Sequence, residues 1–168
     1  MSNWYVLHVR TGCESDVKRE LIRRGYGAAV PTEVKQERRG GHWTVRERLL
    51  IPGYVFVMAS LTAADYYTVL EIPGVIRFLS TDGRPAALPD NEAAYILWLA
   101  NDGKTLQASD IYADGTGVTV ASGPLMGREG SILSINRRTR RATVAISFAG
   151  HRQIVKMAIN VLTPSVKI

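Results

Sequence analysis

Few residues of this 168-residue chain could perform chemistry as catalytic or metal-binding groups. Cys13 is the only cysteine, and the nearest residues that could assist it are His8 and Asp16. The strand and helix expected there send His8 and Cys13 to different faces, so they should not meet as base and nucleophile. No Ser/His/Asp set, carboxylate pair, Gly-rich phosphate loop or Cys/His spacing indicates a catalytic or metal site. We therefore expect a protein that is not an enzyme and that needs neither a cofactor nor a metal.

The strongest chemical signal is a cluster of arginines near the C-terminal end. Residues 137–141 read RRTRR, and guanidinium groups match phosphates and guanine edges with paired hydrogen bonds. Residues 1–105 carry a charge balance of +1, whereas residues 115–168 hold eight Lys and Arg against one Glu, a balance of +7. This imbalance favours nucleic-acid binding over a turn that charge merely keeps solvated. The residues expected to contact RNA are Arg137, Arg138, Arg140, Arg141, Arg152 and Lys156.

The composition excludes several other classes of protein. Hydrophobic residues make up 46% of the chain and charged residues 21%, as in ordinary globular domains. No apolar run approaches the ~20 residues that a membrane span requires, and the N-terminus has no apolar signal core. A single cysteine excludes an internal disulfide and fits a reducing compartment.

One apolar stretch, residues 49–58, organises the first half of the chain. It reads LLIPGYVFVM, in which Pro52-Gly53 predicts a turn and the residues after it predict a strand. Alternation sends the two valines of that strand to one face, and Tyr54, Phe56 and Met58 to the other. The second face is too apolar for water, so either another layer covers it or another protein binds there.

Strands and helices are expected on both sides of this stretch. Residues 3–9 predict a strand with Trp4, Val6 and His8 on one face. A capping box from Thr11 to Glu14 predicts the start of a helix that ends near residue 24. The residues expected to form its buried stripe are Cys13, Val17, Leu21 and Ile22.

A charged hairpin is expected between this helix and the apolar stretch. Residues 35–48 carry five basic and two acidic side chains, and Gly40-Gly41 predicts the tip. The hairpin is either a solvated projection or an arm that faces phosphates, and the sequence leaves both interpretations open.

Two further helices complete the first domain. Thr62 can cap a helix over residues 62–72, and a second helix over residues 91–101 is expected to bury Ala94, Leu97 and Trp98. Helices on one face of a mainly antiparallel sheet predict an α+β sandwich of ferredoxin-like character over residues 1–104.

The sequence pattern changes after residue 104. Residues 105–116 belong to a stretch rich in Gly, Asp, Ser and Thr, which predicts a linker. Residues 117–168 then show about five short strands without a helical period, as expected for a small SH3-like β-barrel.

Four motifs taken together resemble the NusG family of transcription elongation factors over nearly the whole chain. They are WYVLHVRTGCES, LIPGYVFV, IPGVIRFL and GPLMGREGSI, in this order. The last motif resembles the KOW motif through Gly123, Pro124, Gly127 and Gly130, and Gly130 is expected to permit a tight strand entry. The family joins an N-terminal NGN domain to a C-terminal KOW barrel, which matches the two domains expected above.

The resemblance implies specific partners for the N-terminal domain. In the family, the NGN domain binds the clamp helices of the largest subunit of RNA polymerase and contacts the non-template DNA strand. The residues that correspond to the polymerase-binding face are Trp4, Ile51, Pro52, Gly53, Tyr54 and Phe56. The residues that correspond to the DNA-binding edge are Arg10, Arg77, Ser80 and Thr81. A monomer in the bacterial cytoplasm, held at the nucleoid by RNA polymerase and away from membranes, is also implied.

The C-terminal region departs from the housekeeping pattern of the family. Ala149 precedes Gly150 where that pattern has an aromatic residue, and residues 155–158 read VKMA where it has acidic residues. These departures weaken the expectation of KOW contacts with Rho or a small-subunit ribosomal protein. They resemble specialised paralogues of LoaP type, which are antiterminators that recognise an RNA hairpin. We therefore expect an antiterminator that binds a nascent leader RNA hairpin through a stable basic barrel, rather than the helical tail that RfaH can form.

Three other functions remain open. A general NusG elongation and termination factor, whose KOW domain binds Rho or a ribosomal protein, has the same fold. An RNA-modifying or RNA-cleaving enzyme with a KOW-like adaptor would need catalytic residues that the sequence does not indicate. A ribosome-associated RNA binder that uses the barrel alone would leave the apolar face of the first domain without a role.

Overall fold

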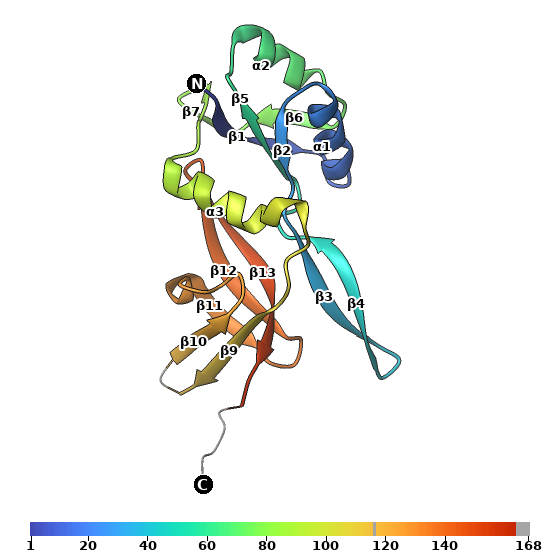
Figure 1. The fold of residues 1–168 in the computed structure, drawn as a ribbon, viewed down its shortest axis with the longest axis vertical. Coiled ribbons are helices and arrows are strands. Elements are labelled where there is room, and N and C mark those ends of the chain that lie inside the picture. The colour runs from blue at the N-terminus through green and yellow to red at the C-terminus, as the bar shows by residue number, and fades with distance from the viewer. Residues whose placement is uncertain (116, 164–168) are drawn as a thin grey trace. The chain divides into compact units, whose positions relative to one another are not determined.

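A computed structural model describes residues 1–115 and 117–163 of the chain. Its internal contacts divide the chain into two compact units (Figure 1). The first unit contains Met1–Pro31, Ile51–Gly103 and Ser147–Arg152, and the second contains Thr32–Leu50, Lys104–Ile146 and the chain from Gln153 onward. The last residue of the expected linker, 116, and the end of the expected second domain, 164–168, lie outside the described residues.

The first unit is built on a four-stranded antiparallel sheet with the order β2-β5-β1-β6. Its strands are β1 (Asn3–Val9), β2 (Gly27–Ala29), β5 (Tyr54–Ala59) and β6 (Val75–Phe78). Its helices are α1 (Glu14–Arg23), α2 (Ala63–Leu70), α3 (Asp90–Ala100) and the 3₁₀ turn η1 (Asn101–Gly103). A small hairpin pairs β7 (Ser80–Thr81) with β8 (Arg84–Pro85). The unit is therefore a mixed α+β fold.

The central strands β1 and β5 alternate as the sequence predicts. Val6 lies opposite Phe56 and His8 lies opposite Tyr54 on one face of the sheet. The valines of β5 are fully buried on the other face, which packs against α1. Both faces of β5 are thus covered except at Met58, which is exposed near the end of the strand.

The start of α1 differs from the expected capping box. The helix begins at Glu14, and its N-cap is Cys13 without a side-chain hydrogen bond, so Thr11 is not the cap. The Glu14 carboxylate is buried and accepts hydrogen bonds from the backbone N–H groups of Gly12 at 2.6 Å and Gly53 at 3.0 Å. Glu14, expected to be the second member of the capping box, thus ties α1 to the turn before β5. Cys13 is half-buried and Ile22 is exposed, so the buried stripe is narrower than expected.

The other two helices give one confirmation and one correction. At α2, Thr62 and Asp65 form the expected cap as a complete capping box. At α3, the buried residues are Tyr95, Ile96 and Leu99, whereas Leu97 and Trp98 are exposed. The expected apolar side of α3 was therefore wrong, because both sides of this helix carry large apolar residues and periodicity alone does not choose between them.

The second unit combines a long hairpin with a five-stranded sheet. The hairpin pairs β3 (Thr32–Arg39) with β4 (His42–Leu49), and its tip at Gly40-Gly41 has two positive φ angles, as the sequence predicts. The sheet has the order β10-β9-β13-β12-β11. Its members are β9 (Ser109–Asp114), β10 (Gly117–Ser122), β11 (Ile132–Asn136), β12 (Arg141–Phe148) and β13 (His151–Val161), with the 3₁₀ turn η2 (Glu129–Ser131) before β11. The ends of β12 and β13 that meet at residues 147–152 belong to the first unit.

The expected linker is partly a strand. Residues 109–114 form β9, which pairs with β10 and runs parallel to β13. Ser109 and Ile111 are buried, so alternating burial, rather than the polar composition of this stretch, decides its structure. The segment that precedes β9 is also held, because Leu106 exchanges backbone hydrogen bonds with Thr32 and Val34 of β3.

The KOW-like loop requires glycine at a different position than expected. Gly123 has a φ of +100°, and a Cβ there would lie 2.6 Å from Cα of Ser109. Gly130 lies in η2 without a positive φ, and a Cβ there would meet nothing within 4 Å. The close approach that only glycine allows is therefore at Gly123. The loop is fixed there by the Ser109 hydroxyl, which accepts a hydrogen bond from the N–H of buried Leu125.

The helices of this chain are short. The longest helix in the described ranges, α3, has 11 residues, and none of those helices could reach across a bilayer.

Candidate functional site

Aromatic side chains gather on one face of the sheet in the first unit. We call the surface formed by Trp4, His8, Tyr54 and Phe56 the aromatic face, because β1 and β5 present these residues on the same side. The rings of His8 and Tyr54 stack with their centroids 5.4 Å apart. Trp4 and Tyr54 are half-buried, whereas Phe56 is fully buried. The structure thus brings together three aromatic residues that the sequence predicts for one face.

A distant part of the chain covers this face. Residues 147–152, which we call the covering segment, place Phe148 edge-on against Tyr54 at 5.3 Å and Phe56 at 5.4 Å between ring centroids. Phe148 is 0% exposed. The backbone N–H of Ala149 donates a 2.9 Å hydrogen bond to the Glu92 carboxylate of α3, which holds the segment in place. The aromatic face is therefore closed by a residue that lies more than ninety positions after β5 begins.

The turn before β5 forms the edge of the aromatic face. Ile51 is buried, Pro52 is exposed, and Gly53 has a φ of +89°. The turn is anchored twice, because the Gly53 carbonyl accepts from the N–H of Val9 at 2.9 Å and the Gly53 N–H donates to Glu14. The predicted polymerase-binding residues are thus contiguous in space.

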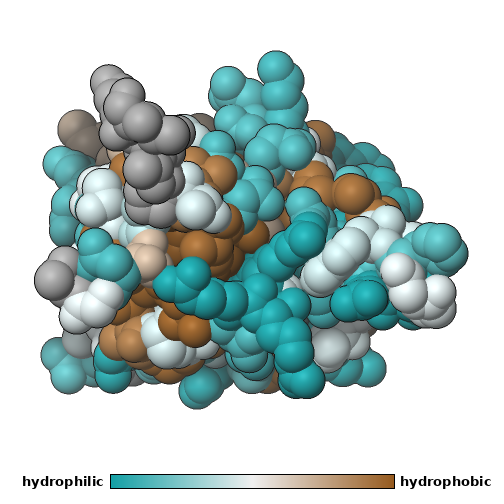
Figure 2. Space-filling model, turned by 90° about the horizontal axis from the view of Figure 1, so that it is seen from below, coloured by the Kyte–Doolittle hydropathy of each residue, from teal (hydrophilic) through white to brown (hydrophobic). Residues whose placement is uncertain are grey.

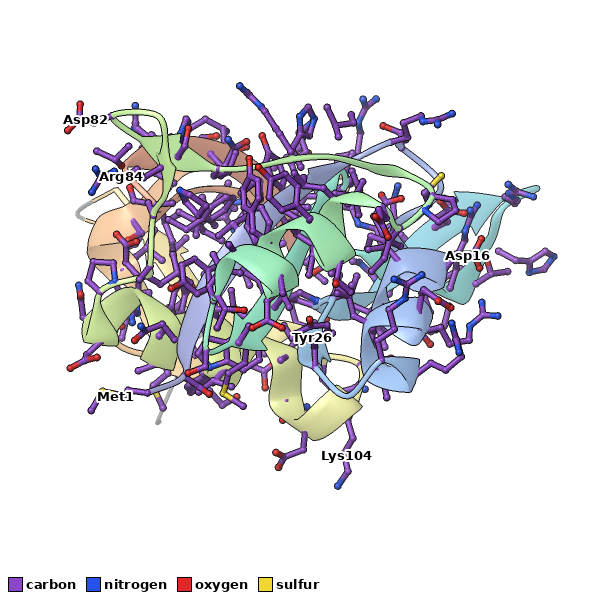
Figure 3. The ribbon with its side chains drawn as sticks, turned by 90° about the horizontal axis from the view of Figure 1, so that it is seen from above. Met1, Asp16, Tyr26, Asp82, Arg84 and Lys104 are labelled. Carbon is purple, nitrogen blue, oxygen red and sulfur yellow. The ribbon has the colours of Figure 1, made fainter. Side chains whose placement is uncertain are left out.

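The residues expected to contact DNA lie along one edge of the same sheet. Arg77 lies on edge strand β6 opposite His8, and Ser80 and Thr81 follow on β7. The N–H of Arg10 donates to the Gly74 carbonyl at 2.8 Å, which places Arg10 next to the start of β6. All four residues are exposed. Figure 3 shows Asp82 and Arg84, at the turn of the β7–β8 hairpin, extending away from the ribbon.

The arginines expected at one RNA-binding tip point to different partners. Arg137 donates to the Ala113 carbonyl at 2.9 Å, and Arg140 donates to the Gln36 side chain of β3. Arg141 is 6% exposed and pairs with Glu33. Arg138 stays exposed, and Arg152 belongs to the covering segment of the first unit. The expected convergence of four guanidinium groups does not occur, because three of them are bound by separate acceptors in the second unit: a backbone carbonyl, a glutamine side chain and a carboxylate.

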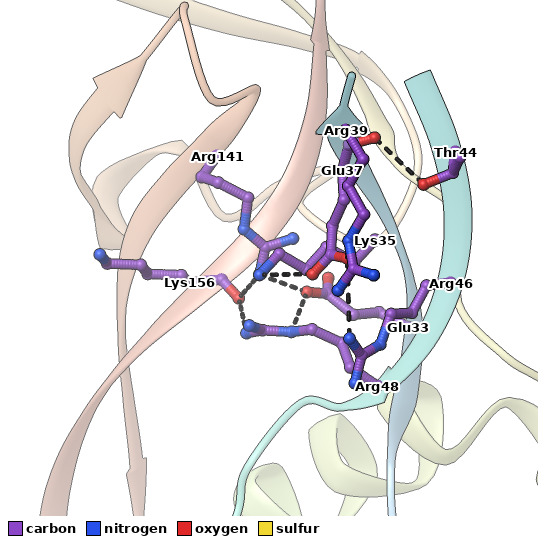
Figure 4. A network of polar contacts seen from close by, with 9 residues as sticks. All are labelled: Glu33, Lys35, Glu37, Arg39, Thr44, Arg46, Arg48, Arg141 and Lys156. Atoms are coloured by element: carbon purple, nitrogen blue, oxygen red, sulfur yellow. Dashed lines mark hydrogen bonds and ion pairs between the residues drawn. The ribbon is translucent and has the colours of Figure 1, made fainter. Parts of the chain in front are cut away.

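Glu33 is the centre of a buried ionic network in the second unit. Its carboxylate pairs with Arg141 at 2.5 Å and Arg48 at 3.1 Å, and it accepts from the Ala158 N–H at 2.9 Å. Both guanidinium groups also donate to the carbonyl of Lys156 (Figure 4). Burial, and then the charge on Arg141, lowers the pKa of Arg48 against the opposing pull of Glu33. This Glu33 network joins the β3–β4 hairpin to strands β12 and β13.

A wide, basic groove opens beside the Glu33 network. Its volume is about 1010 Å³, and all of its lining residues belong to the second unit. We call it the basic groove; its charged lining residues are Lys35, Glu37, Arg38, Arg39, Arg48, Arg138, Arg141 and Lys156. In the space-filling view, hydrophilic side chains run across the middle of the visible face with hydrophobic surface beside them (Figure 2).

Two parts of these sites were not foreseen in the sequence. Glu33 lies in an extended stretch with ordinary polarity, and nothing local distinguishes it from the exposed Glu47. Phe148, one position before the Ala149-Gly150 pair, is not among the residues that the sequence predicts for any site. Its place in an apolar run that ends at the tight turn Ala149-Gly150, with φ angles of 52° and 74°, is the signal that could have identified it.

The described residues hold no group of His, Cys, Asp or Glu side chains that could bind a metal ion. The candidate sites among the described residues are an aromatic face, a polar edge and a basic groove, which are surfaces suited to apolar and anionic partners.

Comparison with known proteins places these features in one family. Residues 2–97 match the family model described as transcription termination factor nusG. The transcription termination/antitermination protein NusG of Pseudomonas aeruginosa is 32% identical over 165 residues, which cover 92% of this chain and 93% of that protein. The protein of the same name from Rickettsia prowazekii is 28% identical and covers 95% of this chain, with 88% of its own length matched.

A solved structure is similar over nearly the whole chain. It is described as "Domain interaction in Thermotoga maritima NusG", is 25% identical, and covers 95% of this chain and 94% of its own, with a TM-score of 0.61. The family match reaches more than half of this chain, and the P. aeruginosa relative exceeds 30% identity over most of it. This chain therefore belongs to the NusG family of transcription termination and antitermination factors.

Proposed function

We propose that this chain binds RNA polymerase through the aromatic face, with the turn at Ile51-Pro52-Gly53 as the edge of the contact. Family membership supports this role, and so does the chemistry of the face. Aromatic side chains bury a large area at a modest cost in conformational entropy, and they are enriched among the residues that dominate binding energy. The expected docking partner is the pair of clamp helices of the largest subunit, in the bacterial cytoplasm.

This proposal rests on one observation: the residue that covers the aromatic face comes from a distant part of the chain. The rings of Tyr54 and Phe56 pack against Phe148, which is not part of the sheet or helices that make up the rest of the first unit. The part of the face at Tyr54 and Phe56 that Phe148 covers can be exposed without breaking the hydrogen bonds of its own sheet.

Docking through this face requires Phe148 to leave it. The apparent affinity for polymerase is then reduced by the fraction of molecules in which the covering segment is in place. Two variants should therefore act in opposite directions. Tyr54→Ala removes an anchor and should weaken binding by about 30-fold, the equivalent of ~2 kcal/mol for a residue central to an interface. Phe148→Ala removes the cover and should strengthen binding.

Binding of purified bacterial core polymerase to the labelled full-length chain measures both effects. Tyr67→Ala is the matched control, because this tyrosine is exposed on α2 away from the aromatic face. A general loss of stability would weaken binding in every variant, so a gain in Phe148→Ala separates uncovering from misfolding. Unchanged binding in Tyr54→Ala would refute the docking surface.

The two-domain organisation belongs to the same proposal. We assign residues 1–104, including the β3–β4 hairpin whose contacts group it with the second unit, to an NGN domain of ferredoxin-like character. The five-stranded sheet that follows is assigned to a KOW domain of SH3-like barrel type. The linker is then shorter than the expected 105–116, because β9 begins at Ser109. The exposed residues Arg10, Arg77, Ser80 and Thr81 are proposed to contact the non-template DNA strand, since they lie along one edge of the NGN sheet.

We also propose that the KOW domain binds nascent RNA and that the chain is a specialised antiterminator of LoaP type. The charge balance of +7 after residue 115 and the VKMA sequence at 155–158 support this role. Sequencing of RNA that co-purifies with the tagged protein tests it. A specialised factor should enrich a few leaders, which are expected to share a hairpin.

A general elongation and termination factor is the second candidate, because the similar P. aeruginosa and R. prowazekii proteins match along most of their length and both carry the general name. Such a factor would bind Rho or a small-subunit ribosomal protein through its KOW domain. It should enrich nearly all nascent transcripts in the same experiment, and that outcome would replace the specialised role.

A further inference from the structure

The basic groove of the second unit is a site whose ligand the family assignment does not supply. Its walls come from the β3–β4 hairpin and from the strands on either side of the β11–β12 turn, all within the same unit. Its volume of about 1010 Å³ is at the upper end of the range for small-molecule pockets, ~300–1,000 Å³. The groove is therefore large enough for a chain-like ligand.

The charge of the groove is strongly one-sided. Seven lysine and arginine side chains line it, and Glu37 is the one carboxylate among the described lining residues. Glu37 already pairs with Lys35 at 3.4 Å and with Arg39 at 3.9 Å. An anionic ligand is the chemistry that such a lining recognises.

The lining cations divide into structural and available groups. Arg48 and Arg141 are held by Glu33 in the buried network that fixes the hairpin against the sheet. In contrast, the side chains of Arg38, Arg138 and Lys156 are exposed and make no ion pair or hydrogen bond with any described residue. The network thus builds the groove, and these three side chains remain available to a ligand.

One structural arginine also has a donor that is not used. Arg141 is 6% exposed, and its Nη2 atom donates both to Glu33 and to the Lys156 carbonyl. Its Nη1 atom is buried and has no hydrogen-bond partner, although Arg141 lines the groove. An unsatisfied buried guanidinium nitrogen costs stability, so an acceptor from a ligand at this position would remove that cost.

An aromatic ring lies at the same site. Trp43 of β4 lines the groove and is 39% exposed, and the Arg140 guanidinium lies over its ring at 3.9 Å from the centroid. Arg140 is fixed in turn by its hydrogen bond to Gln36. The indole is thus held rigidly on one side by a cation, which leaves exposed ring surface for stacking.

We infer that the basic groove binds an unpaired polynucleotide strand, with phosphates on Arg38, Arg138 and the Arg141 Nη1 atom and a base stacked on Trp43. Free cations together with a stacking ring are the two components of single-strand binding sites. A duplex satisfies only the first, because its bases are stacked on each other and are not available to the indole. This inference rests on the RNA-binding role proposed above and defines both the surface and the form of the bound strand.

Fluorescence anisotropy with the full-length chain tests the groove. The probes are labelled single-stranded U₁₂, the corresponding single-stranded dT₁₂, and a blunt RNA duplex of the same length. The expected order is tighter binding of the single strands than of the duplex. The stronger of the two single strands identifies the source, nascent RNA or the non-template DNA strand of the transcription bubble.

Two variants separate the stacking and phosphate contacts. Trp43→Ala should weaken U₁₂ binding by about 5- to 150-fold, the equivalent of ~1–3 kcal/mol per stacked base. Arg38→Ala combined with Arg138→Ala should lower the slope of log affinity against log salt by about 1.4, at ~0.7 per phosphate contact. Arg46→Ala is the matched control, since Arg46 lies on the same hairpin but does not line the groove.

The outcomes distinguish this inference from the proposal on which it rests. Arg137 and Arg152 lie outside the lining, and Arg137→Ala with Arg152→Ala removes charge from other exposed positions of the chain. If that pair weakens RNA binding while Trp43→Ala and the groove arginine pair do not, the chain binds RNA elsewhere and the groove assignment is wrong. Preferential binding of the duplex would also overturn it. Failure of the wild-type chain to bind any probe would refute the RNA-binding role itself. Because Trp43 is partly exposed, circular dichroism of Trp43→Ala should match the wild type, and the arginine pair provides an independent readout if it does not.

Discussion

The aromatic face of the first unit and the basic groove of the second unit, both proposed as binding surfaces, differ in their exposure to solvent. The aromatic face is closed, because Phe148 covers Tyr54 and Phe56. The basic groove is open, and Arg38, Arg138 and Lys156 extend from it. Exposed apolar area is unfavourable in water, whereas an exposed cation is well hydrated. An apolar surface is therefore stabilised by a cover, whereas a charged surface is stable in contact with water.

Residues distant in sequence contribute to both surfaces, but one covers its surface and the other holds its surface together. Phe148 covers a face that the sheet of the first unit has already formed. Glu33, by contrast, fixes the walls of the basic groove, since it pairs with Arg48 of the hairpin and Arg141 of the sheet. Removal of the first residue should expose a surface, and removal of the second should destroy one.

The largest expected effect follows from removing the centre of the Glu33 network. Glu33→Ala leaves Arg141 buried without its carboxylate, which should cost about 3–5 kcal/mol of unfolding free energy. Urea denaturation measures the loss. Glu37→Ala is the control, because its ion pairs are partly exposed to solvent and should contribute far less. Equal losses in the two variants would show that the buried network does not hold the groove together.

Removing the cover should have a clear effect on exposed apolar surface. Phe148→Ala eliminates two edge-to-face ring contacts, each worth about 0.5–1.5 kcal/mol beyond burial of area. We expect increased fluorescence of a hydrophobic dye such as ANS under native conditions, since the aromatic face becomes accessible. Phe78→Ala removes a buried ring that contacts Tyr5 and Tyr66 instead, and should not increase dye binding. Equal dye binding in both variants would mean that Phe148 is an ordinary core residue.

The available cations of the groove should contribute little to stability. Arg38→Ala combined with Arg138→Ala removes exposed side chains without partners, so unfolding free energy should change by less than about 0.5 kcal/mol. The same variant should lose nucleic-acid affinity, as argued above. A stability loss of several kcal/mol would contradict the division of the groove into structural and available cations.

The smallest effect concerns a partly buried polar contact in the first unit, which adds a third case to the comparison. The Tyr26 hydroxyl donates to Asp65 at 2.7 Å, and this bond and then those from Thr62 hold the pKa of the Asp65 carboxyl below its usual 3.8. Its contribution to stability is therefore complete above pH 3.8 and is lost as the pH falls through the lower pKa of the folded state.

Thermal melts of the wild type and Asp65→Asn between pH 7 and pH 2 measure this contribution. The difference in melting temperature should be constant from pH 7 to about pH 5 and should narrow in more acidic solution. A difference that does not depend on pH would mean that the charge of Asp65 is irrelevant to the cap of α2.

Local sequence signals determined much of the fold. The Gly-Gly tip of the β3–β4 hairpin, the Thr62 cap and the alternation of β5 depend on neighbouring residues, and each is found as predicted. The buried side of α3 was missed, because Tyr95 and Ile96 compete with Leu97 and Trp98 as apolar candidates. Strand β9 was missed because polar composition concealed the alternation of buried Ser109 and Ile111.

The sequence by itself determined the kinds of surface that this protein has: an aromatic strand face, a polar sheet edge and a basic C-terminal half. Only the tertiary structure decided which residues form the sites. In the structure, Arg141 forms a buried ion pair with Glu33 and Phe148 lies over the aromatic face. Arg140, from a turn distant in sequence, lies over the ring of Trp43. The physical reason is range: turns, caps and alternation are fixed by bonds between near neighbours in the chain. Burial and ion pairing depend on which segments pack together in the fold, and a local sequence pattern does not specify those segments.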